Sequence, residues 1–194
     1  MDPYLYPGTL VLNNRKGIRD SDFLTLVEAD ATSRRILNLE FKATPDVFYV
    51  SNFLEIHSYI FQDLYLWAGK LRTVEIARSG QMSFARVEHL ESSLDHLFSA
   101  LRQEHFLRNI AVEDFCKRAA YNLGELNAIH PFRDGNVRTL REFIRQLAKS
   151  NGYVLDWFRV STSDMSAASI RSFQHGDATG LERLLLAAIQ RSGV

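Results

Sequence analysis

Apolar residues recur with a helical period along most of the chain. Between Pro45 and about Trp67, apolar side chains keep to one helix face, and Gly69 follows as a helix-ending residue: Val47, Val50, Leu54, Phe61 and Leu64. Helical patterns also cover about residues 21–39, 87–104, 112–128 and 181–189. Only four prolines occur, and three of them lie before residue 50, which leaves room for long helices afterwards. The pattern predicts a mainly α-helical protein.

His57 lies on the apolar stripe of the segment that begins at Pro45. A histidine in that position is more often a packed core residue than a catalytic one. The sequence therefore predicts that His57 is buried and structural.

The helical rhythm breaks between about residues 73 and 85. The side chains alternate in character as in a β-strand over Thr73, Val74, Glu75 and Ile76. Ser79-Gly80 can form a turn, and residues 82–85 can form the returning strand. This pattern predicts a small β-hairpin. An isolated hairpin is marginally stable and has unpaired edges, so it must pack against something or pair with something.

Composition and charge narrow the class of protein. The chain has 194 residues, of which 46% are hydrophobic, so one domain spanning residues 1–194 with a sizeable core is expected. Lys+Arg and Asp+Glu both number 23, so no overall field favours nucleic acid or a membrane. The single cysteine, Cys116, lies in an apolar helical pattern and fits a buried thiol in a reducing compartment. With no membrane-spanning run and no secretory signal at the start, a cytoplasmic location is expected.

The candidate chemistry is concentrated in residues 130–141, His-Pro-Phe-Arg-Asp-Gly-Asn-Val-Arg-Thr-Leu-Arg. His130 can act as a general base near neutral pH. Asp134 offers hard oxygen to a divalent cation such as Mg²⁺, which reaches nucleotides through one or two carboxylates and the phosphates. Gly135 and Asn136 lead into a helix whose free N–H groups can face an anion. These parts together favour a polyphosphate site.

The helix that follows, to about residue 149, has two separate faces. Its apolar stripe anchors it: Leu140, Phe143, Ile144 and Leu147. At about 100° per residue, Arg138, Arg141 and Arg145 fall within about 60° of each other beside that stripe. The sequence therefore predicts one face for packing and another that holds anions. Phe132 has no reactive group, so it is interpreted as a buried plug that fixes the loop.

Other catalytic patterns are missing from the sequence. His89 and His96 are seven apart without the spacing of a zinc site, and neither a Gly-x-Ser-x-Gly elbow nor a phosphate-binding P-loop occurs.

Residues 130–141 resemble the signature of the Fic (filamentation induced by cAMP) family, His-x-Phe-x-Asp/Glu-Gly-Asn-Gly-Arg-x-x-Arg, at every fixed position except one, where Val137 replaces the last glycine. The opening residues 2–9 resemble the start of bacterial members. The segment from Ile56-His57 to Arg72, with Trp67-Ala68-Gly69, resembles the approach to the family's flap. The resemblance implies a helical Fic fold with the hairpin flap beside the active-site loop.

The family's usual reaction is transfer of AMP from ATP to a hydroxyl side chain of a target protein. The resemblance implies a role in this reaction for each residue of the motif. His130 would take the hydroxyl proton and Asp134 would hold Mg²⁺. Gly135 and Asn136 would line the anion hole, with the Asn136 amide also reaching phosphate and Val137 beside it. Arg138 and Arg141 would bind phosphates, with Arg141 orienting the γ-phosphate. The flap, Thr73 to Ile76, would pair with the main chain of the target.

The resemblance also implies a form of control. Many members are inhibited by a Glu followed by Gly or Asn, which pairs with the second motif arginine. No such dipeptide occurs in this chain. A separate small antitoxin would then supply the Glu to Arg141, and the target could belong to the type II topoisomerases, as for toxins of this family.

Val137 leaves two alternatives open. Doc-like relatives replace the same glycine with lysine and transfer phosphate from a reversed ATP, although they lack the glycine that this chain keeps at Gly135. The other alternative is a binding module whose nucleotide pocket has decayed. A positive φ at Val137 would cost on the order of 1–3 kcal/mol, whereas a helical Val137 would keep its N–H and merely crowd the ligand.

Overall fold

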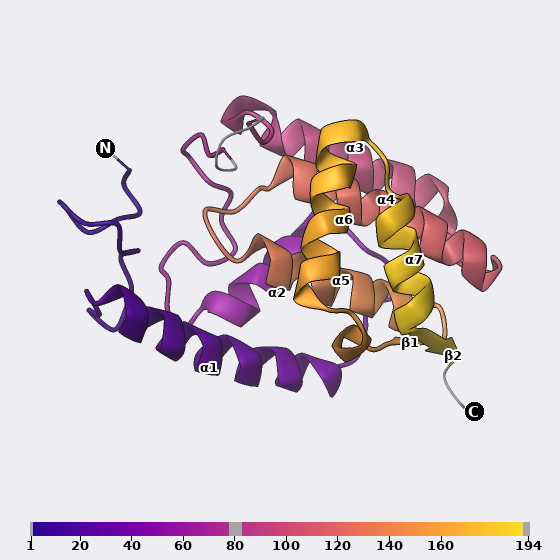
Figure 1. The fold of residues 1–194 in the computed structure, drawn as a ribbon, viewed down its shortest axis with the longest axis horizontal. Helices are drawn as coiled ribbons and strands as arrows, with labels where there is room; N and C mark the ends of the chain where they lie inside the picture. The colour runs from indigo at the N-terminus through magenta and orange to yellow at the C-terminus, as the bar shows by residue number, and fades with distance from the viewer. Residues whose placement is uncertain (1, 78–82, 192–194) are drawn as a thin grey trace.

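The computed structural model describes residues 2–77 and 83–191, and helices dominate this part of the chain (Figure 1). The α-helices are α1 (Ser21–Glu40), α2 (Val50–Phe61), α3 (Leu90–Gln103), α4 (Val112–Ile129), α5 (Asn136–Ser150), α6 (Thr162–His175) and α7 (Thr179–Ala188). Three short 3-10 helices, η1 (Val87–His89), η2 (His105–Leu107) and η3 (Trp157–Arg159), and two strands, β1 (Tyr153–Leu155) and β2 (Ile189–Arg191), complete the elements of the described residues. The predicted mainly α-helical fold is confirmed.

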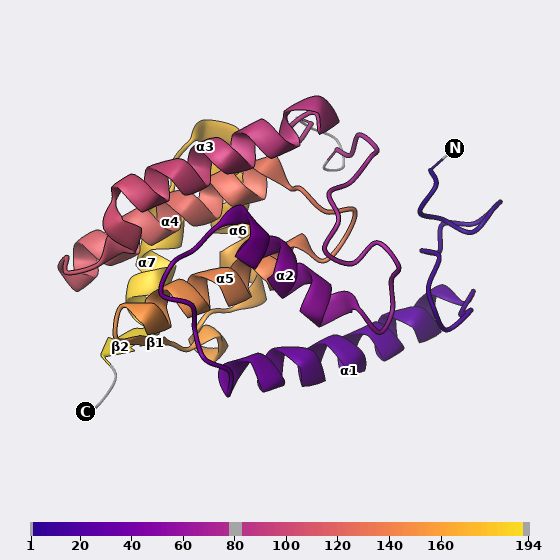
Figure 2. The ribbon, with the colours of Figure 1, turned by 180° about the vertical axis from the view of Figure 1, so that it is seen from behind.

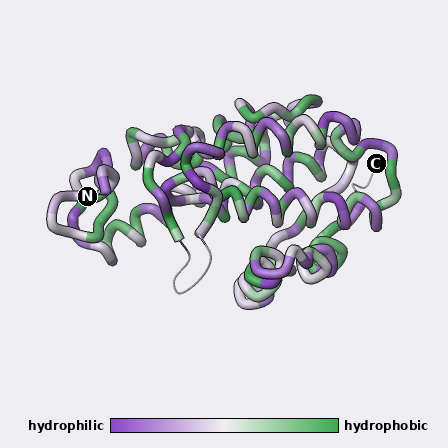
Figure 3. Tube along the Cα trace, turned by 90° about the horizontal axis from the view of Figure 1, so that it is seen from above, coloured by the Kyte–Doolittle hydropathy of each residue, from purple (hydrophilic) through white to green (hydrophobic). Residues whose placement is uncertain are grey.

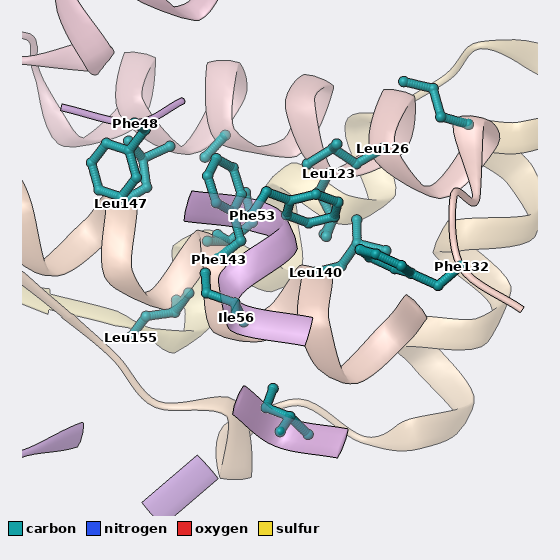
Figure 4. Close-up of a cluster of buried hydrophobic side chains, with 14 of the residues drawn as sticks. Phe48, Phe53, Ile56, Leu123, Leu126, Phe132, Leu140, Phe143, Leu147 and Leu155 are labelled. Carbon is teal, nitrogen blue, oxygen red and sulfur yellow. The ribbon is translucent and has the colours of Figure 1, made fainter. Parts of the chain in front are cut away.

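The core lies between α2, α4 and α5. Helix α4 packs against α5, α6 and α7, and α5 also packs against α2. Phenylalanine rings fill the centre (Figure 4): Phe53 lies 5.6 Å from Phe143 and 5.4 Å from Phe132 between ring centroids. Cys116 is buried in α4, as expected for an inert thiol, and burial raises the pKa of its thiol to about 12. This packing holds the two ends of the motif loop, which joins α4 to α5.

Helix α2 is shorter than the sequence predicts at both ends. It begins at Val50 because the Asn52 side chain accepts a hydrogen bond from the Tyr49 backbone N–H at 2.9 Å and caps the helix there. It ends at Phe61, since the chain then turns back onto it. Gly69 completes that return with a φ of +80°, and a Cβ at this position would lie 2.7 Å from the Cβ of Ser58. The predicted helix end at Gly69 is therefore a turn that packs on α2.

In the predicted hairpin at residues 73–85, the described residues form no regular strand. The described residues of this segment, called the flap below, form a single antiparallel bridge between Ala77 and Ser83. The predicted turn at Ser79-Gly80 lies outside the described residues. A two-stranded antiparallel sheet forms elsewhere, where β1 pairs with β2 and Tyr153 lies opposite Arg191. Strands of three residues are too short to show a period in the sequence.

Helix α1 runs along one edge of the molecule in both views (Figures 1 and 2). Asp20 begins it by accepting a hydrogen bond from the Phe23 backbone N–H at 2.8 Å. Hydrophobic and hydrophilic positions alternate along the helices (Figure 3). None of the described helices combines the length and the apolar character needed to cross a membrane.

Candidate active site

The motif loop places His130 at the point where α4 ends. His130 is the C-cap of that helix and adopts a left-handed conformation with a φ of 48°. Phe84, from the returning part of the flap, stacks on the imidazole with a ring-centroid distance of 3.9 Å and an interplanar angle of 13°. The backbone turn and the stacked ring together fix the direction of the imidazole. No role for Phe84 could be predicted from the sequence, because 46 positions separate it from His130 along the chain.

Asn136 closes the motif loop. Its Oδ1 accepts a hydrogen bond from the Phe132 backbone N–H at 2.9 Å, and its Nδ2 donates to the Phe132 carbonyl at 2.8 Å. The side chain is buried and engaged within the loop, and contact of this residue with phosphate stays a prediction. Phe132 is fully buried, as the plug interpretation requires.

Gly135 is the residue that lets the loop enter α5. It is the N-cap with a φ of +79°, and a Cβ there would lie 2.3 Å from Cζ of Phe61. No larger side chain fits without displacing that buried ring. Val137 follows inside the first turn of α5 and is absent from the positive-φ positions, so the strained alternative does not apply. Its side chain is 52% exposed.

His57 supports the loop from below and is confirmed as a core residue. Its imidazole stacks on Phe132 at 3.8 Å between ring centroids. The Gly69 backbone N–H donates to Nδ1 at 2.8 Å, so Nε2 carries the proton and donates to the Asp134 carbonyl at 3.0 Å. Burial lowers the pKa of His57 to about 4. A neutral imidazole thus ties the Gly69 turn to the motif loop.

This burial has a consequence for acid stability. The unfolded chain takes up the His57 proton near pH 6.5 and the folded chain only near pH 4. The free energy of unfolding should therefore fall, by on the order of 3 kcal/mol, as the pH drops from about 6.5 to about 4. Urea unfolding across this range measures it. The His57→Gln variant should be less stable at pH 7, and its free energy of unfolding should change less with pH than that of the parent. An unchanged dependence of the free energy of unfolding on pH would contradict the assignment.

The three arginines of α5 have different environments. Arg138 donates to Glu28 of α1 at 2.5 Å and to the Thr32 hydroxyl at 3.2 Å. Arg145 is held by both oxygens of Glu142 at 2.7 Å, which corrects its predicted place on an anion-holding face. Glu28 was missed by the sequence analysis, because nothing in α1 marks it as the partner of a residue 110 positions away.

Arg141 differs from its two neighbours. Its guanidinium lies over the Trp157 ring at 5.6 Å, and the Trp157 Nε1–H donates to the Arg141 carbonyl at 3.1 Å. Its Nε is buried with no hydrogen-bond partner, and no carboxylate of the described residues lies within ion-pair distance. Burial lowers its pKa. A desolvated cation in this position favours an incoming anion.

Asp134 is the carboxylate of the loop. Its Oδ1 accepts a hydrogen bond from the Gly135 backbone N–H and lies 3.8 Å from Nη2 of Arg138. The side chain is 46% exposed. Within the described ranges no three His, Cys, Asp or Glu residues gather as a metal site, so a cation here would need oxygens from a ligand. That donor set fits Mg²⁺ held by one carboxylate and phosphates.

Arg72 joins the flap to the motif loop. Its buried guanidinium donates to the His130 carbonyl at 2.9 Å, to the Val74 carbonyl at 2.9 Å and to the Ala85 carbonyl. Its own backbone N–H donates to the Pro131 carbonyl at 2.9 Å. The guanidinium thus ties both sides of the flap to the motif loop.

The predicted target-docking residues lie beside this network. Thr73 donates its backbone N–H to the Tyr4 hydroxyl at 3.0 Å, and the Glu75 carboxylate accepts from the Val87 backbone N–H at 3.0 Å. Ile76 is half-buried. The flap is therefore anchored to both the N-terminal segment and the start of η1.

Two cavities meet at His130 and Val137. The first, of about 450 Å³, is lined by the motif loop and the start of α5, including Arg138. The second, of about 420 Å³, lies between the flap, α4, α5 and α6 and is lined by Arg141, Phe84 and Met165. His130 and Val137 therefore line both cavities, one beside the motif loop and Arg138 and the other beside Arg141.

Comparison with known proteins identifies the family of this chain. The model of the Fic/DOC family matches residues 48–148. The chain is 40% identical to the protein adenylyltransferase VbhT of Bartonella schoenbuchensis over 98% of its own length, but spans only 39% of that protein. It is 34% identical to the probable protein adenylyltransferase Fic of Salmonella typhimurium, covering 98% of this chain and 94% of that one.

Solved structures give the same answer for the fold. The BepC protein of Bartonella tribocorum, with bound AMPPNP, superposes with a TM-score of 0.92 at 25% identity and covers 98% of this chain and 97% of its own. A Fic domain of Bartonella quintana with bound ADP gives a TM-score of 0.92 at 26% identity, covering 97% of this chain and 94% of that one. The chain belongs to the Fic/DOC family.

Proposed function

We propose that this chain is a protein adenylyltransferase, which transfers AMP from ATP to a hydroxyl side chain of a target protein. Its support is the activity named for its relatives and the adenine nucleotides bound by similar structures. The observation that carries the proposal is Arg141, a half-buried guanidinium with a buried Nε and no carboxylate partner among the described residues, on the same cavity as His130. A positive charge held in this way beside a candidate base fits a phosphate ligand.

The residues divide the reaction between them. The target hydroxyl oxygen attacks the α-phosphorus while its proton passes to the His130 imidazole, and the bond from the α-phosphorus to the bridging oxygen breaks to release pyrophosphate. Arg141 and the free N–H groups at the start of α5 stabilise the phosphate charge. The Glu28 carboxylate neutralises Arg138 in this structure, so Arg138 adds positive charge to the phosphate site only when that ion pair opens.

Asp134 is the residue that would hold Mg²⁺, which when bound supplies positive charge to the phosphates. The flap, from Thr73 to Ile76, would register the target by main-chain pairing next to the Phe84–His130 stack. The direct test is transfer of the α-label of ATP to a protein of a bacterial lysate, with type II topoisomerases as the first purified targets.

Val137 should limit the rate rather than abolish it. Its side chain borders both cavities from the first turn of α5, where the family signature has glycine. Val137→Gly should therefore raise AMP transfer, by up to about 10²-fold if a crowded anion contact is restored. Glycine should also cost about 1 kcal/mol of stability in the helix. Label transfer and urea unfolding measure the two effects.

Val137→Ala is the matched control, because it removes the bulk while keeping helix propensity. It should recover part of the gain without the loss in stability. Equal rates for the parent and both variants would mean that Val137 does not crowd the ligand.

We also propose control by a separate partner. Glu28 pairs with the first motif arginine, whereas Arg141, the second, has no carboxylate partner in the described part of the chain. A small antitoxin whose Glu meets Arg141 would block the phosphate site. Expression of this chain alone should then slow bacterial growth, and expression of His130→Ala should not. Normal growth with protein that is demonstrably active in the same cells would contradict a toxin role.

A further inference from the structure

Helix α1 carries apolar residues on two opposite faces. The inner face packs on the bundle through the buried Leu24 and Leu39. The opposite face has three large apolar side chains, and a fourth follows at the C-cap of the helix, with exposed fractions of 55%, 69%, 54% and 83%: Phe23, Leu26, Leu37 and Phe41. Scattered exposed apolar residues are ordinary, but a row along one helix face marks an interaction surface.

These four residues and the charged pair Asp30 and Arg34 between them, together called the outer stripe below, are aligned with the helix axis. Phe23 and Phe41 are 18 positions apart, which is five turns, so they project in nearly the same direction, about 27 Å apart along the axis. Leu26 and Leu37 fall within about 60° of that direction. Between the two apolar pairs, Asp30 and Arg34 form an exposed ion pair at 3.1 Å. The outer stripe is therefore apolar at both ends and charged at its centre.

The order of residue types along the outer stripe is almost the same from either end. In two antiparallel helices, facing residues have position numbers with a constant sum. Phe23 and Phe41 sum to 64, Asp30 and Arg34 also sum to 64, and Leu26 and Leu37 sum to 63. A two-fold axis near Thr32 would thus place phenylalanine on phenylalanine, leucine on leucine, and aspartate on arginine.

We infer that the outer stripe binds a second copy of this chain, with the two α1 helices antiparallel about a two-fold axis. The apolar ends lose water in the dimer, and the central Asp30 of each copy meets Arg34 of the other. A parallel pairing would instead place aspartate on aspartate and arginine on arginine. A polar centre in an apolar helix seam commonly fixes register and orientation in this way.

The size of this surface determines the expected affinity of the dimer. One helix face of this length provides less area than the roughly 1,200–2,000 Å² buried in standard interfaces. The dimer should therefore dissociate on dilution, and sedimentation of the full chain over a range of concentrations should show monomer and dimer in exchange. A monomer at every concentration would overturn the inference.

Substitutions within the outer stripe test its location. Leu26→Glu should leave the protein folded, since the side chain is 69% exposed, and abolish dimerisation. Leu66→Glu is the matched control, because Leu66 is 71% exposed but lies outside α1, and its dimer should persist. Dimerisation that survives Leu26→Glu, or that is lost equally in both, would overturn the inference.

Charge reversal tests the centre of the outer stripe. Asp30→Arg alone would face arginine with arginine, and Arg34→Asp alone would face aspartate with aspartate, so each should dimerise more weakly than the parent. A mixture of the two should form a heterodimer, and the double exchange within one chain should restore the homodimer. Failure of both rescues would contradict pairing through Asp30 and Arg34.

Cysteine cross-linking tests the antiparallel register. Phe23→Cys mixed with Phe41→Cys should form a disulfide-linked heterodimer under mild oxidation, whereas neither alone should cross-link efficiently. The native Cys116 is buried and should not interfere. Efficient cross-linking of Phe23→Cys with itself would instead show a parallel pair and overturn the proposed arrangement.

Discussion

His130→Ala should lower AMP transfer by roughly 10²–10⁴-fold, the usual contribution of a general base. The imidazole is proposed to act on the acceptor hydroxyl, so ATP affinity should remain close to that of the parent. Initial rates of label transfer, together with titration of an ATP analogue, separate the two effects.

The left-handed backbone at His130 calls for a second variant. Alanine tolerates that conformation poorly, whereas asparagine adopts it more readily. His130→Asn should therefore keep the parent's thermal unfolding temperature and still lose transfer. A parent-like rate in either variant would remove His130 from the reaction.

Arg72→Ala should have the largest effect on structure. It leaves the carbonyls of His130, Val74 and Ala85 without the buried donor that satisfies them. Unsatisfied buried acceptors cost about 1–3 kcal/mol each, so we expect the free energy of unfolding to fall by at least about 3 kcal/mol. Urea unfolding measures this loss.

Arg72→Lys separates charge from geometry. A lysine keeps the positive charge but cannot reach carbonyls on both sides of the flap with a planar fork. We expect transfer to the protein target to fall more than ATP binding, because the flap and His130 are displaced together. Arg86→Ala is the control, since this exposed arginine should change stability by less than about 1 kcal/mol. Parent-like stability of Arg72→Ala would contradict the network.

The sequence predicted the parts of the site that lie close together along the chain. The order His130, Phe132, Asp134, Gly135 identifies the loop, because a left-handed entry and a buried plug depend on local residues. The burial of His57 follows equally from its place on an apolar stripe. In these cases local pattern and three-dimensional structure carry the same information.

Other features depend on distant residues and could not be predicted in this way. The pairing of Glu28 with Arg138 joins two helices 110 positions apart, and the stacking of Phe84 on His130 depends on how the flap returns. The described residues of Thr73–Ile76 form no strand, and the buried Arg72 donates to the Val74 and Ala85 carbonyls there. Strand propensity measures only a local preference, which tertiary contacts can override.

Labelled ATP tests the proposed activity most directly. The purified chain, a bacterial lysate and Mg²⁺ are incubated with ATP labelled at the α- or the γ-phosphate, and His130→Asn serves as the blank. We predict label on a target protein from α-labelled ATP and none from γ-labelled ATP. Label from the γ-phosphate alone would mean phosphate transfer of the Doc type. No label from either, even with Val137→Gly, would contradict an active transferase and favour a nucleotide-binding module.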